Sequence, residues 1–475
     1  MTPVERTTLP AAADNGLRRL STGNPAADEI LGGGFPVNSI NIIMGAPGTG
    51  KTLFAQQLAL FNADADRPVL YLTTLSEPLG KVVTYLQQLT FYDESKMGTA
   101  VRYDDLSDAL TEHGIIALLS RVREAIKQIS PAIIIIDSFK AVHDLASSVA
   151  EMRRFVAELA GLLTAYDTTT FLVGEYTEDE IVRYPEFAVA DSIVEFARHK
   201  RSTSDERYVR VSKLRGGSYS EGLHAFRITA GGLEFFPRLV PPDFPRDYRF
   251  STKRISTGVP GLDAMVGGGL LQGSCMLVAG PSGSGKTTAA IQFCLEGRRR
   301  GSPVLYVNFQ ENPTQLGRLI ETLGGDGALE DQGWHSMYVS PVELQIDSII
   351  GRAFALIREK RIRRVVVDGV GDLLIASGDT QRVHNYLYAM YQHFARNEVS
   401  SLLTLETPIG YGSQLGSQTE HLQVSALSDC ILLLDIAAGD VLRRTACVVK
   451  ARNSAHDLAI RNLEITPAGV RIGEP

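Results

Sequence analysis

Two short stretches of the sequence carry the residue types that a protein needs to hold a phosphate group. "GAPGTGKT" (45–52) and "GPSGSGKT" (280–287) both fit the pattern G-x-x-x-x-G-K-[ST]. Glycines in such a loop let the backbone N–H groups turn toward phosphate oxygens at the N-terminus of a helix. The two stretches therefore predict two nucleotide sites, made of Gly45, Gly48, Thr49, Gly50, Lys51, Thr52, Leu53, Gly280, Gly283, Ser284, Gly285, Lys286, Thr287 and Thr288.

The lysine of each loop is a candidate for catalysis as well as for binding. Lys51 and Lys286 are expected to reach the β- and γ-phosphates of ATP. The alternative is a glycine-rich turn that fits the pattern by accident. Two copies, each placed between a strand-like and a helix-like segment, argue against that alternative.

Each site is also expected to hold Mg²⁺, because the ion accompanies ATP in such loops. The hydroxyl groups of Thr52 and Thr287 are the first candidate ligands. Asp137 and Asp368 each end an apolar strand, "IIIID" and "RVVVD", and are the second. In isolation, an Asp after a strand is more often a turn former. With a phosphate loop upstream, and because ligands of open parallel sheets bind at the carboxyl ends of strands, the metal role is favoured.

The phosphate loops belong to a longer repeat. Residues 21–52 align without a gap with residues 256–287, and both begin with Ser-Thr-Gly and end with Gly-Lys-Thr. The matches fall on turn and phosphate-binding residues, which indicates shared backbone geometry rather than a shared apolar bias. We therefore infer a tandem duplication.

Within each copy, apolar β-branched segments alternate with amphipathic segments. In the first copy this pattern predicts strands at 39–45, 69–74, 132–138 and 169–175, and helices at 51–63, near 108–128 and near 148–165. Such alternation is typical of an α/β fold with a mostly parallel sheet and helices on both faces. Later segments without intervening helices, such as "DSIVEFARH" and "YVRVSKLRG", predict antiparallel strands at the sheet edge. The expected domains are 19–236 and 255–475, with a flexible arm at 1–18 and a Pro-rich linker at 237–254.

Composition limits the classes of function. The chain has 475 residues, too many for one ordinary core, and no apolar run approaches the length of a membrane span. Its N-terminus lacks the basic start and apolar segment of a secretory signal, and its four cysteines have no metal-ligand spacing, so a cytoplasmic protein is expected. A net charge of −7 argues against a general nucleic-acid binder.

Taken together, these motifs resemble the KaiC family of hexameric circadian-clock ATPases and autokinases. The resemblance rests on "TGxPxxDxxxGGG" before each phosphate loop and on a late Lys-x-Arg motif in each half, and it spans about 20–470. It implies two tandem RecA-like P-loop NTPase domains, ATP and Mg²⁺ as ligands, and a homo-oligomer, expected to be a hexamer.

In KaiC-type rings ATP lies between subunits, and the neighbouring subunit contributes the Lys-x-Arg motif. The resemblance implies this role for Lys213, Arg215, Lys450, Arg452 and His456. In the first half, Tyr219 stands where the family has the trailing histidine. Alternating Lys and Arg on one face of a strand also suits phosphate oxygens. Exposed strand charges without a ligand are the alternative.

The family activates water with a Glu-Glu pair in the turn after the second strand. Here these turns read "YLTTLSEP" (71–78) and "YVNFQENP" (306–313), which places Leu75 and Gln310 at the first Glu, and Ser76 and Glu311 at the second. Leu75 cannot accept a proton, and Gln310 is a very poor base. We therefore expect ATP binding at both sites, little hydrolysis in the first domain and weak hydrolysis in the second, supported by Glu311.

The family's phosphoacceptor pair falls on Ser425 and Ala426. Ser425 is therefore the candidate for autophosphorylation, and an ordinary solvated loop serine is the alternative. After "EITPAGVRIGEP" we find no counterpart of the tail that binds KaiA in the family, so a KaiA-like regulator is not expected. A KaiB-like or histidine-kinase signalling partner fits the resemblance better.

Three classes of function follow from these observations. The first is a KaiC-like ATPase that forms a double-ring hexamer. The second is a nucleotide-gated signalling scaffold with negligible catalysis, suggested by Leu75, Ser76 and Gln310. The third is a RecA-type ATPase acting on DNA, which the acidic net charge and the lack of a basic, aromatic-rich groove disfavour.

Overall fold

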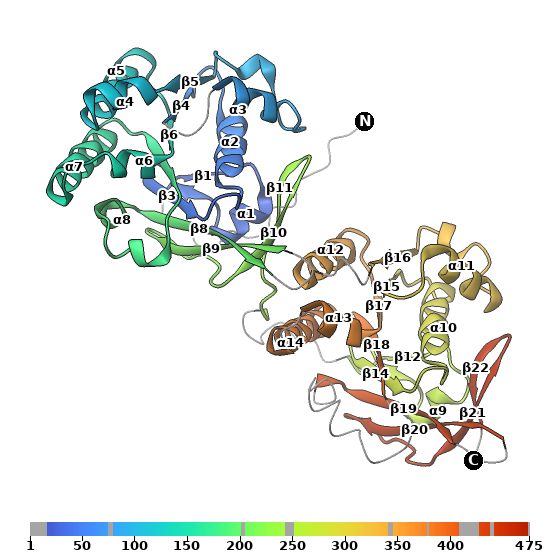
Figure 1. Cartoon of the computed structure of the whole chain (residues 1–475). Helices are drawn as coiled ribbons and strands as arrows, with labels where there is room; N and C mark the ends of the chain where they lie inside the picture. Colours follow the sequence, from blue (N-terminus) through green and yellow to red (C-terminus); the bar gives the residue numbers. More distant parts are fainter. Residues whose placement is uncertain are drawn as a thin grey trace. The chain divides into compact units, whose positions relative to one another are not determined.

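The computed structural model divides the chain into two compact units, Met1–Arg238 and Leu239–Pro475. It describes residues 17–74, 79–200, 205–242, 251–340, 345–377, 380–407, 427–437 and 441–473. Most of the predicted arm and residues 243–250 of the predicted linker lie outside these ranges. Each unit is an α/β domain of the RecA-like kind that the sequence predicts (Figure 1).

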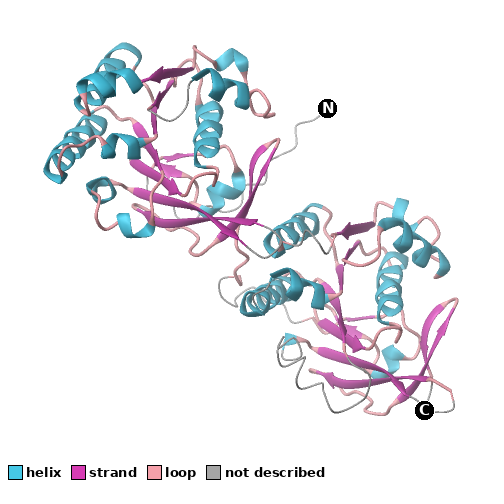
Figure 2. Cartoon of the chain, in the orientation of Figure 1, coloured by secondary structure: helices cyan, strands magenta, loops and turns pink. Residues whose placement is uncertain are grey.

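In the first unit, helices flank a central sheet (Figures 1 and 2). The helices are α1 (Pro25–Ile30), α2 (Lys51–Asn62), α3 (Leu79–Leu86), α4 (Ser107–His113), α5 (Ile116–Ile129), α6 (Phe139–Asp144), α7 (Val149–Ala165) and α8 (Pro185–Val189). The strands are β1 (Arg19–Leu20), β2 (Phe35–Pro36), β3 (Ile40–Gly45), β4 (Val69–Thr73), β5 (Val101–Asp105), β6 (Ile133–Asp137), β7 (Thr169–Gly174), β8 (Ser192–Lys200), β9 (Asp205–Leu214), β10 (His224–Thr229) and β11 (Gly232–Phe236).

The strand order of this sheet, over the described residues, is β11-β10-β9-β8-β3-β7-β6-β4-β5. Neighbours from β8 to β5 run parallel, because helices connect them. The strands β8 to β11 follow one another through short connections and pair antiparallel. The antiparallel edge predicted from "DSIVEFARH" and "YVRVSKLRG" is confirmed.

The core of the first unit follows the two-residue period of its strands. Ile42 of β3 belongs to an apolar cluster with α5 and α7, whereas its neighbour Ile43 belongs to a cluster with α2. Successive side chains of a strand point to opposite faces, so a strand of consecutive apolar residues needs helices on both sides. The predicted helix near 108–128 is two helices, since Gly114, with φ +65°, ends α4.

The second unit repeats this plan. Its helices are α9 (Leu262–Met265), α10 (Lys286–Arg299), α11 (Pro313–Thr322), α12 (Ile346–Glu359), α13 (Val370–Ser377) and α14 (Thr380–Arg396). Its strands are β12 (Arg254–Ile255), β13 (Leu270–Leu271), β14 (Cys275–Gly280), β15 (Val304–Asn308), β16 (Trp334–Tyr338), β17 (Arg364–Asp368), β18 (Ser400–Glu406), β19 (Cys430–Ala437), β20 (Arg443–Ala451), β21 (Arg461–Thr466) and β22 (Gly469–Ile472).

The second sheet, over the described residues, has the order β16-β15-β17-β18-β14-β19-β20-β21-β22. Leu277 of β14 packs with α12 and α14, and its neighbour Met276 packs with α10 on the other face. All four cysteines are free and buried. Among the described residues of both units, no helix has the length and apolar character needed to cross a membrane.

Candidate functional site

Both phosphate loops connect a central strand to the helix that follows it. The first runs from β3 into α2, and the second from β14 into α10. Gly50 and Gly285 stand at the N-caps of these helices with φ of +102° and +104°, a conformation that strongly favours glycine. The N-terminal N–H groups of α2 and α10 therefore point out of the carboxyl edge of each sheet, where an anion is stabilised.

The loop lysines fold back along their own loops. Lys51 Nζ donates to the carbonyl of Ala46 at 2.8 Å, and Lys286 Nζ donates to the carbonyls of Gly280 and Pro281 at 2.9 and 2.8 Å. Burial lowers the pKa of both lysines, and nearby carboxylates partly offset that effect. Both ammonium groups are thus placed inside the loop that would surround a phosphate.

Asp137 and Asp368 lie at the ends of β6 and β17, next to the loops. Each accepts a hydrogen bond from a buried tyrosine on the neighbouring strand, Tyr71 for Asp137 (2.9 Å) and Tyr306 for Asp368 (2.6 Å). Burial raises the pKa of Asp137, although hydrogen bonds from Thr52 and Tyr71 act against the rise. The tyrosines escaped the sequence reasoning, yet both recur at the same position of the repeat, which was the available signal.

These oxygen donors fit the chemistry of Mg²⁺. The ion prefers oxygen ligands and usually takes only one or two from the protein, with water and phosphate supplying the rest. In the first unit Thr52 and Asp137 line the same cavity, and the Thr52 side chain acts to lower the pKa of the Asp137 carboxyl. In the parts of the chain that the structure describes, no group of three or more His, Cys, Asp or Glu forms a metal cluster. When bound, Mg²⁺ would neutralise phosphate charge there.

A cavity of about 740 Å³ opens beside the first loop. Its lining includes Lys51, Thr52, Leu53, Asp137 and Glu175. Glu175 follows β7, the strand between β3 and β6, and its charge raises the pKa of Lys51 against the effect of burial. Glu406 ends β18 at the corresponding place and acts on Lys286 in the same way. A Glu directly after an apolar strand marks both residues, and the sequence reasoning applied that signal only to aspartates.

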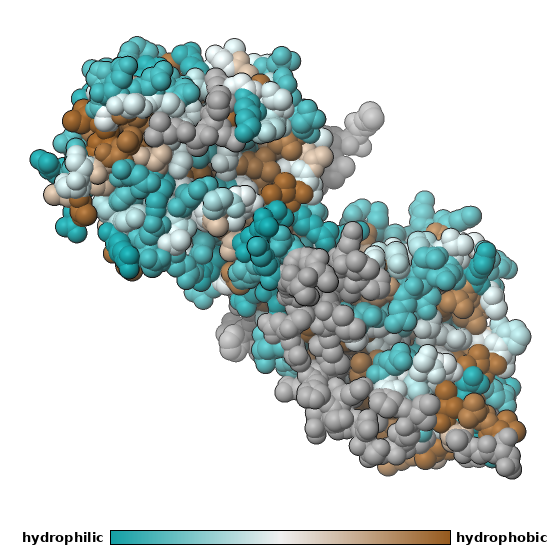
Figure 3. Space-filling model, in the orientation of Figure 1, coloured by the Kyte–Doolittle hydropathy of each residue, from teal (hydrophilic) through white to brown (hydrophobic). Residues whose placement is uncertain are grey.

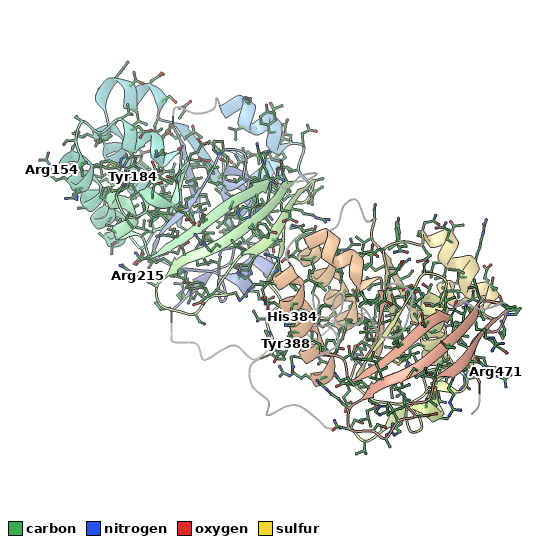
Figure 4. All side chains as sticks on the ribbon, turned by 60° about the horizontal axis from the view of Figure 1, so that its bottom comes forward. Arg154, Tyr184, Arg215, His384, Tyr388 and Arg471 are labelled. Atoms are coloured by element: carbon green, nitrogen blue, oxygen red, sulfur yellow. The ribbon has the colours of Figure 1, made fainter. Side chains whose placement is uncertain are left out.

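Lys140 is a second lining residue that the sequence reasoning missed. It lies in the first turn of α6 and pairs with the carboxylate of Glu180. Its ammonium group also lies 5.1 and 4.9 Å from the ring centres of Tyr176 and Tyr184, within cation–π range. Figure 4 labels Tyr184 in the first unit. The interactions with Glu180 and both rings hold this cation at the edge of the nucleotide cavity.

The two turns that correspond to the family's Glu-Glu pair follow β4 in the first unit and β15 in the second. Leu75, Ser76 and the rest of 75–78 lie outside the described residues. In the second unit, burial and then the charge of Asp368 raise the pKa of Glu311. Gln310 Nε2 donates to Asp372 Oδ2 at 3.3 Å. Glu311 is therefore close enough to the strand-end aspartate for their charges to interact.

The Lys-x-Arg motifs lie at the ends of β9 and β20, at the sheet edge opposite the phosphate loops. Lys213 pairs with Ile193 near the start of β8, whereas the phosphate loop begins beside Phe196. Three residues of strand separate these levels by about 10 Å. Arg215 follows β9, its backbone N–H donates to the carbonyl of Asp191, and its side chain is 59% exposed (Figure 4). The motif therefore lies at the sheet edge opposite the phosphate loop of its own unit.

The second unit repeats this placement. Lys450 pairs with Ile431 at the start of β19, and the N–H of Arg452 donates to the carbonyl of Asp429. His456 lies half-buried in the connection between β20 and β21. Burial and the adjacent arginine lower the pKa of both motif lysines, Lys213 and Lys450. Ser425, the phosphoacceptor candidate, lies outside the described residues.

In a comparison with known proteins, one family profile matches each unit separately. The profile of the family described as "ATPase: KaiC" covers residues 20–240 and 255–475. The circadian clock oscillator protein KaiC of Rippkaea orientalis is 28% identical, over 96% of this chain and 89% of its own length. That of Picosynechococcus sp. is 29% identical, over 97% and 90%. The circadian clock protein KaiC3 of Synechocystis sp. is 27% identical, over 97% and 93%.

The hydrogen bond from Tyr306 to Asp368 is expected to tune Mg²⁺ binding. In Tyr306→Phe, one carboxylate oxygen loses its partner and the ligand is less firmly oriented, so we expect the Mg²⁺ concentration that half-saturates nucleotide binding to rise by about tenfold. Titrating Mg²⁺ against a fluorescent ATP analogue measures this midpoint. Tyr338→Phe, which alters an exposed tyrosine of the same unit, is the control. Equal midpoints for the two variants would contradict the expectation.

Proposed function

Because the chain belongs to the KaiC family of ATPases, we propose that it binds ATP at both loops, assembles into a double-ring hexamer and hydrolyses ATP weakly, mainly in its second unit. The observation that carries this proposal is the difference between the two water-activating turns. In the second unit, Glu311 is close enough to Asp368 for the charge of that aspartate to raise the pKa of Glu311. The corresponding positions of the first unit are Leu75 and Ser76, neither of which is a base at neutral pH.

The first site is proposed to bind ATP and hydrolyse it little. Glu175 is a carboxylate in its cavity, but the residue stands between β3 and β6 and its charge acts on Lys51. In this proposal Glu175 acts on the loop lysine through its charge and is not assigned the role of taking a proton from water. The first unit therefore serves in this proposal as a nucleotide-dependent contact between subunits.

Assembly is supported by where the motif cations lie. The four motif cations lie at the sheet edges opposite the phosphate loops of their own units, which suits contact with a nucleotide held by a neighbouring copy. They are Lys213, Arg215, Lys450 and Arg452. The second unit also exposes apolar residues around β21, including Leu458 (67%) and Ile460 (60%), and Figure 3 shows hydrophobic surface there. Exposed apolar surface of this kind is typical of protein contacts.

A cytoplasmic location belongs to the same proposal. All four thiols are buried and unpaired, which suits a reducing compartment.

Phosphate release from single-site variants tests the division of labour between the units. Removing a loop lysine removes the charge that binds the β- and γ-phosphates. At protein concentrations where mass photometry shows each variant to be assembled like the parent, we expect Lys286→Ala to lower the release of phosphate by at least about tenfold and Lys51→Ala to leave most of it. The double variant sets the background. A parent rate equal to that background would support the scaffold function instead, and a larger loss in Lys51→Ala would reverse the assignment of the two units.

Ring assembly is tested through the arginines. Arg215→Ala and Arg452→Ala each remove a charged hydrogen bond to phosphate, worth about 1.5–3 kcal/mol. We therefore expect the ATP concentration needed for hexamers to rise by about tenfold or more in mass photometry with Mg²⁺. Arg154→Ala, at an exposed position of α7, is the matched control (Figure 4). A parent that stays monomeric with ATP would refute the ring.

The proposal also includes autophosphorylation at Ser425. Intact-mass measurement after incubation with ATP is expected to show one added phosphoryl group on the parent and none on Ser425→Ala. Incubation with ADP in place of ATP controls for adducts. A phosphoryl group on both proteins would remove the assignment of this serine.

A further inference from the structure

Asp372, in the first turn of α13, holds its carboxylate directly against the end of β17. A β-carbon built onto residue 369 would lie 2.4 Å from Asp372 Oδ2, so the carboxylate occupies space that only a glycine leaves open. Gly369 also has φ +101°, and the N–H of Asp372 donates to its carbonyl at 3.0 Å. The carboxylate is thereby held against Gly369, the residue that follows Asp368, at the edge of the sheet where the phosphate loop lies.

The first unit lacks this arrangement. Ser138 and Ala141 stand at the positions of Gly369 and Asp372, counted from the strand-end aspartates. Ser138 is bound by Thr74, the residue that follows β4. Its N–H donates to Thr74 Oγ1 and its carbonyl accepts from the same hydroxyl, both at 2.9 Å. In the second unit, Thr404 of β18 accepts instead from the N–H of Gly369 at 2.7 Å. The two sites thus differ in geometry beside the same aspartate.

Gln310 links this carboxylate to the turn after β15. Its amide donates to Asp372 Oδ2, and among the residues that the structure describes it is the sole donor to that carboxylate. Oδ1 is therefore left to accept from water. Gln310 stands where the family has the first Glu of its pair, and here it binds a carboxylate of α13.

We propose that Asp372 is the residue that takes the proton from water in the second unit, with Gln310 as the positioning residue. The oxygen of water bonds to the γ-phosphorus as its proton passes to Asp372 Oδ1. The bond from phosphorus to the bridging oxygen breaks, and its electron pair leaves with ADP. In this proposal Glu311 takes no proton and contributes only its negative charge to the site. The inference rests on the proposed hydrolysis in the second unit and names the residue that performs it.

The test compares phosphate release in the full-length chain, with Lys286→Ala as the baseline for the second site. Asp372→Asn keeps the shape and the contact with Gln310 but loses the base. We expect the release that depends on Lys286 to fall by at least about tenfold, with unchanged affinity for a fluorescent ATP analogue. Glu321→Gln removes one charge from an exposed position of α11 and is expected to match the parent.

A swap separates chemistry from structure. Gln310→Glu combined with Asp372→Asn keeps the hydrogen bond between the two residues and returns the carboxylate to the turn. We expect it to recover most of the lost rate, which a purely structural role of Asp372 would not allow. Asp372→Asn at the parent rate, a loss of nucleotide affinity equal to the loss of rate, or no recovery by the swap would each overturn the inference. A parent no faster than Lys286→Ala would overturn the proposed hydrolysis itself, and the inference with it.

Discussion

The parallel register of three neighbouring strands is the constraint on which both sites depend. In the first unit β7 lies between β3 and β6, so the ends of these strands bring the phosphate loop, Glu175 and Asp137 to one edge. Adjacent strands are about 4.8 Å apart, which sets these groups within reach of one small ligand. In the second unit β18 does the same for Gly280, Glu406 and Asp368. Neither site survives a shift of one strand by one residue, because every side chain would change face.

The duplication preserved this register and changed what lies around it. The loops, the strand-end aspartates and the tyrosines that bind them recur in both units. The hydrogen bond to the residue after the aspartate does not recur, since Thr74 binds Ser138 in one unit and Thr404 binds Gly369 in the other. A glycine beside the aspartate leaves room for a carboxylate from the next helical turn, and a serine does not. Two copies of one scaffold can therefore differ in catalysis without differing in fold.

The position of the Lys-x-Arg motifs follows from the antiparallel edge of each sheet. β9 and β20 run against the parallel strands, so their last residues return to the edge opposite the phosphate loop. Cations at that edge lie about 10 Å along the strand from the phosphate loop of their own unit. A complete site in this proposal thus needs a second copy of the chain, which makes nucleotide binding and assembly a single equilibrium.

The sequence by itself determined the duplicated α/β fold, the two loops and the strand-end aspartates. Those features depend on local rules, namely glycines where φ is positive and consecutive apolar residues where a strand is buried on both faces. The single helix expected near 108–128 was wrong, because Gly114 breaks it. Only the tertiary structure decided that Glu175 enters the first cavity, that two tyrosines bind the aspartates, and that Asp372 meets Gln310 beside Gly369. Such contacts join residues 62 or more positions apart, and the order of the strands, which no local pattern encodes, brings them together.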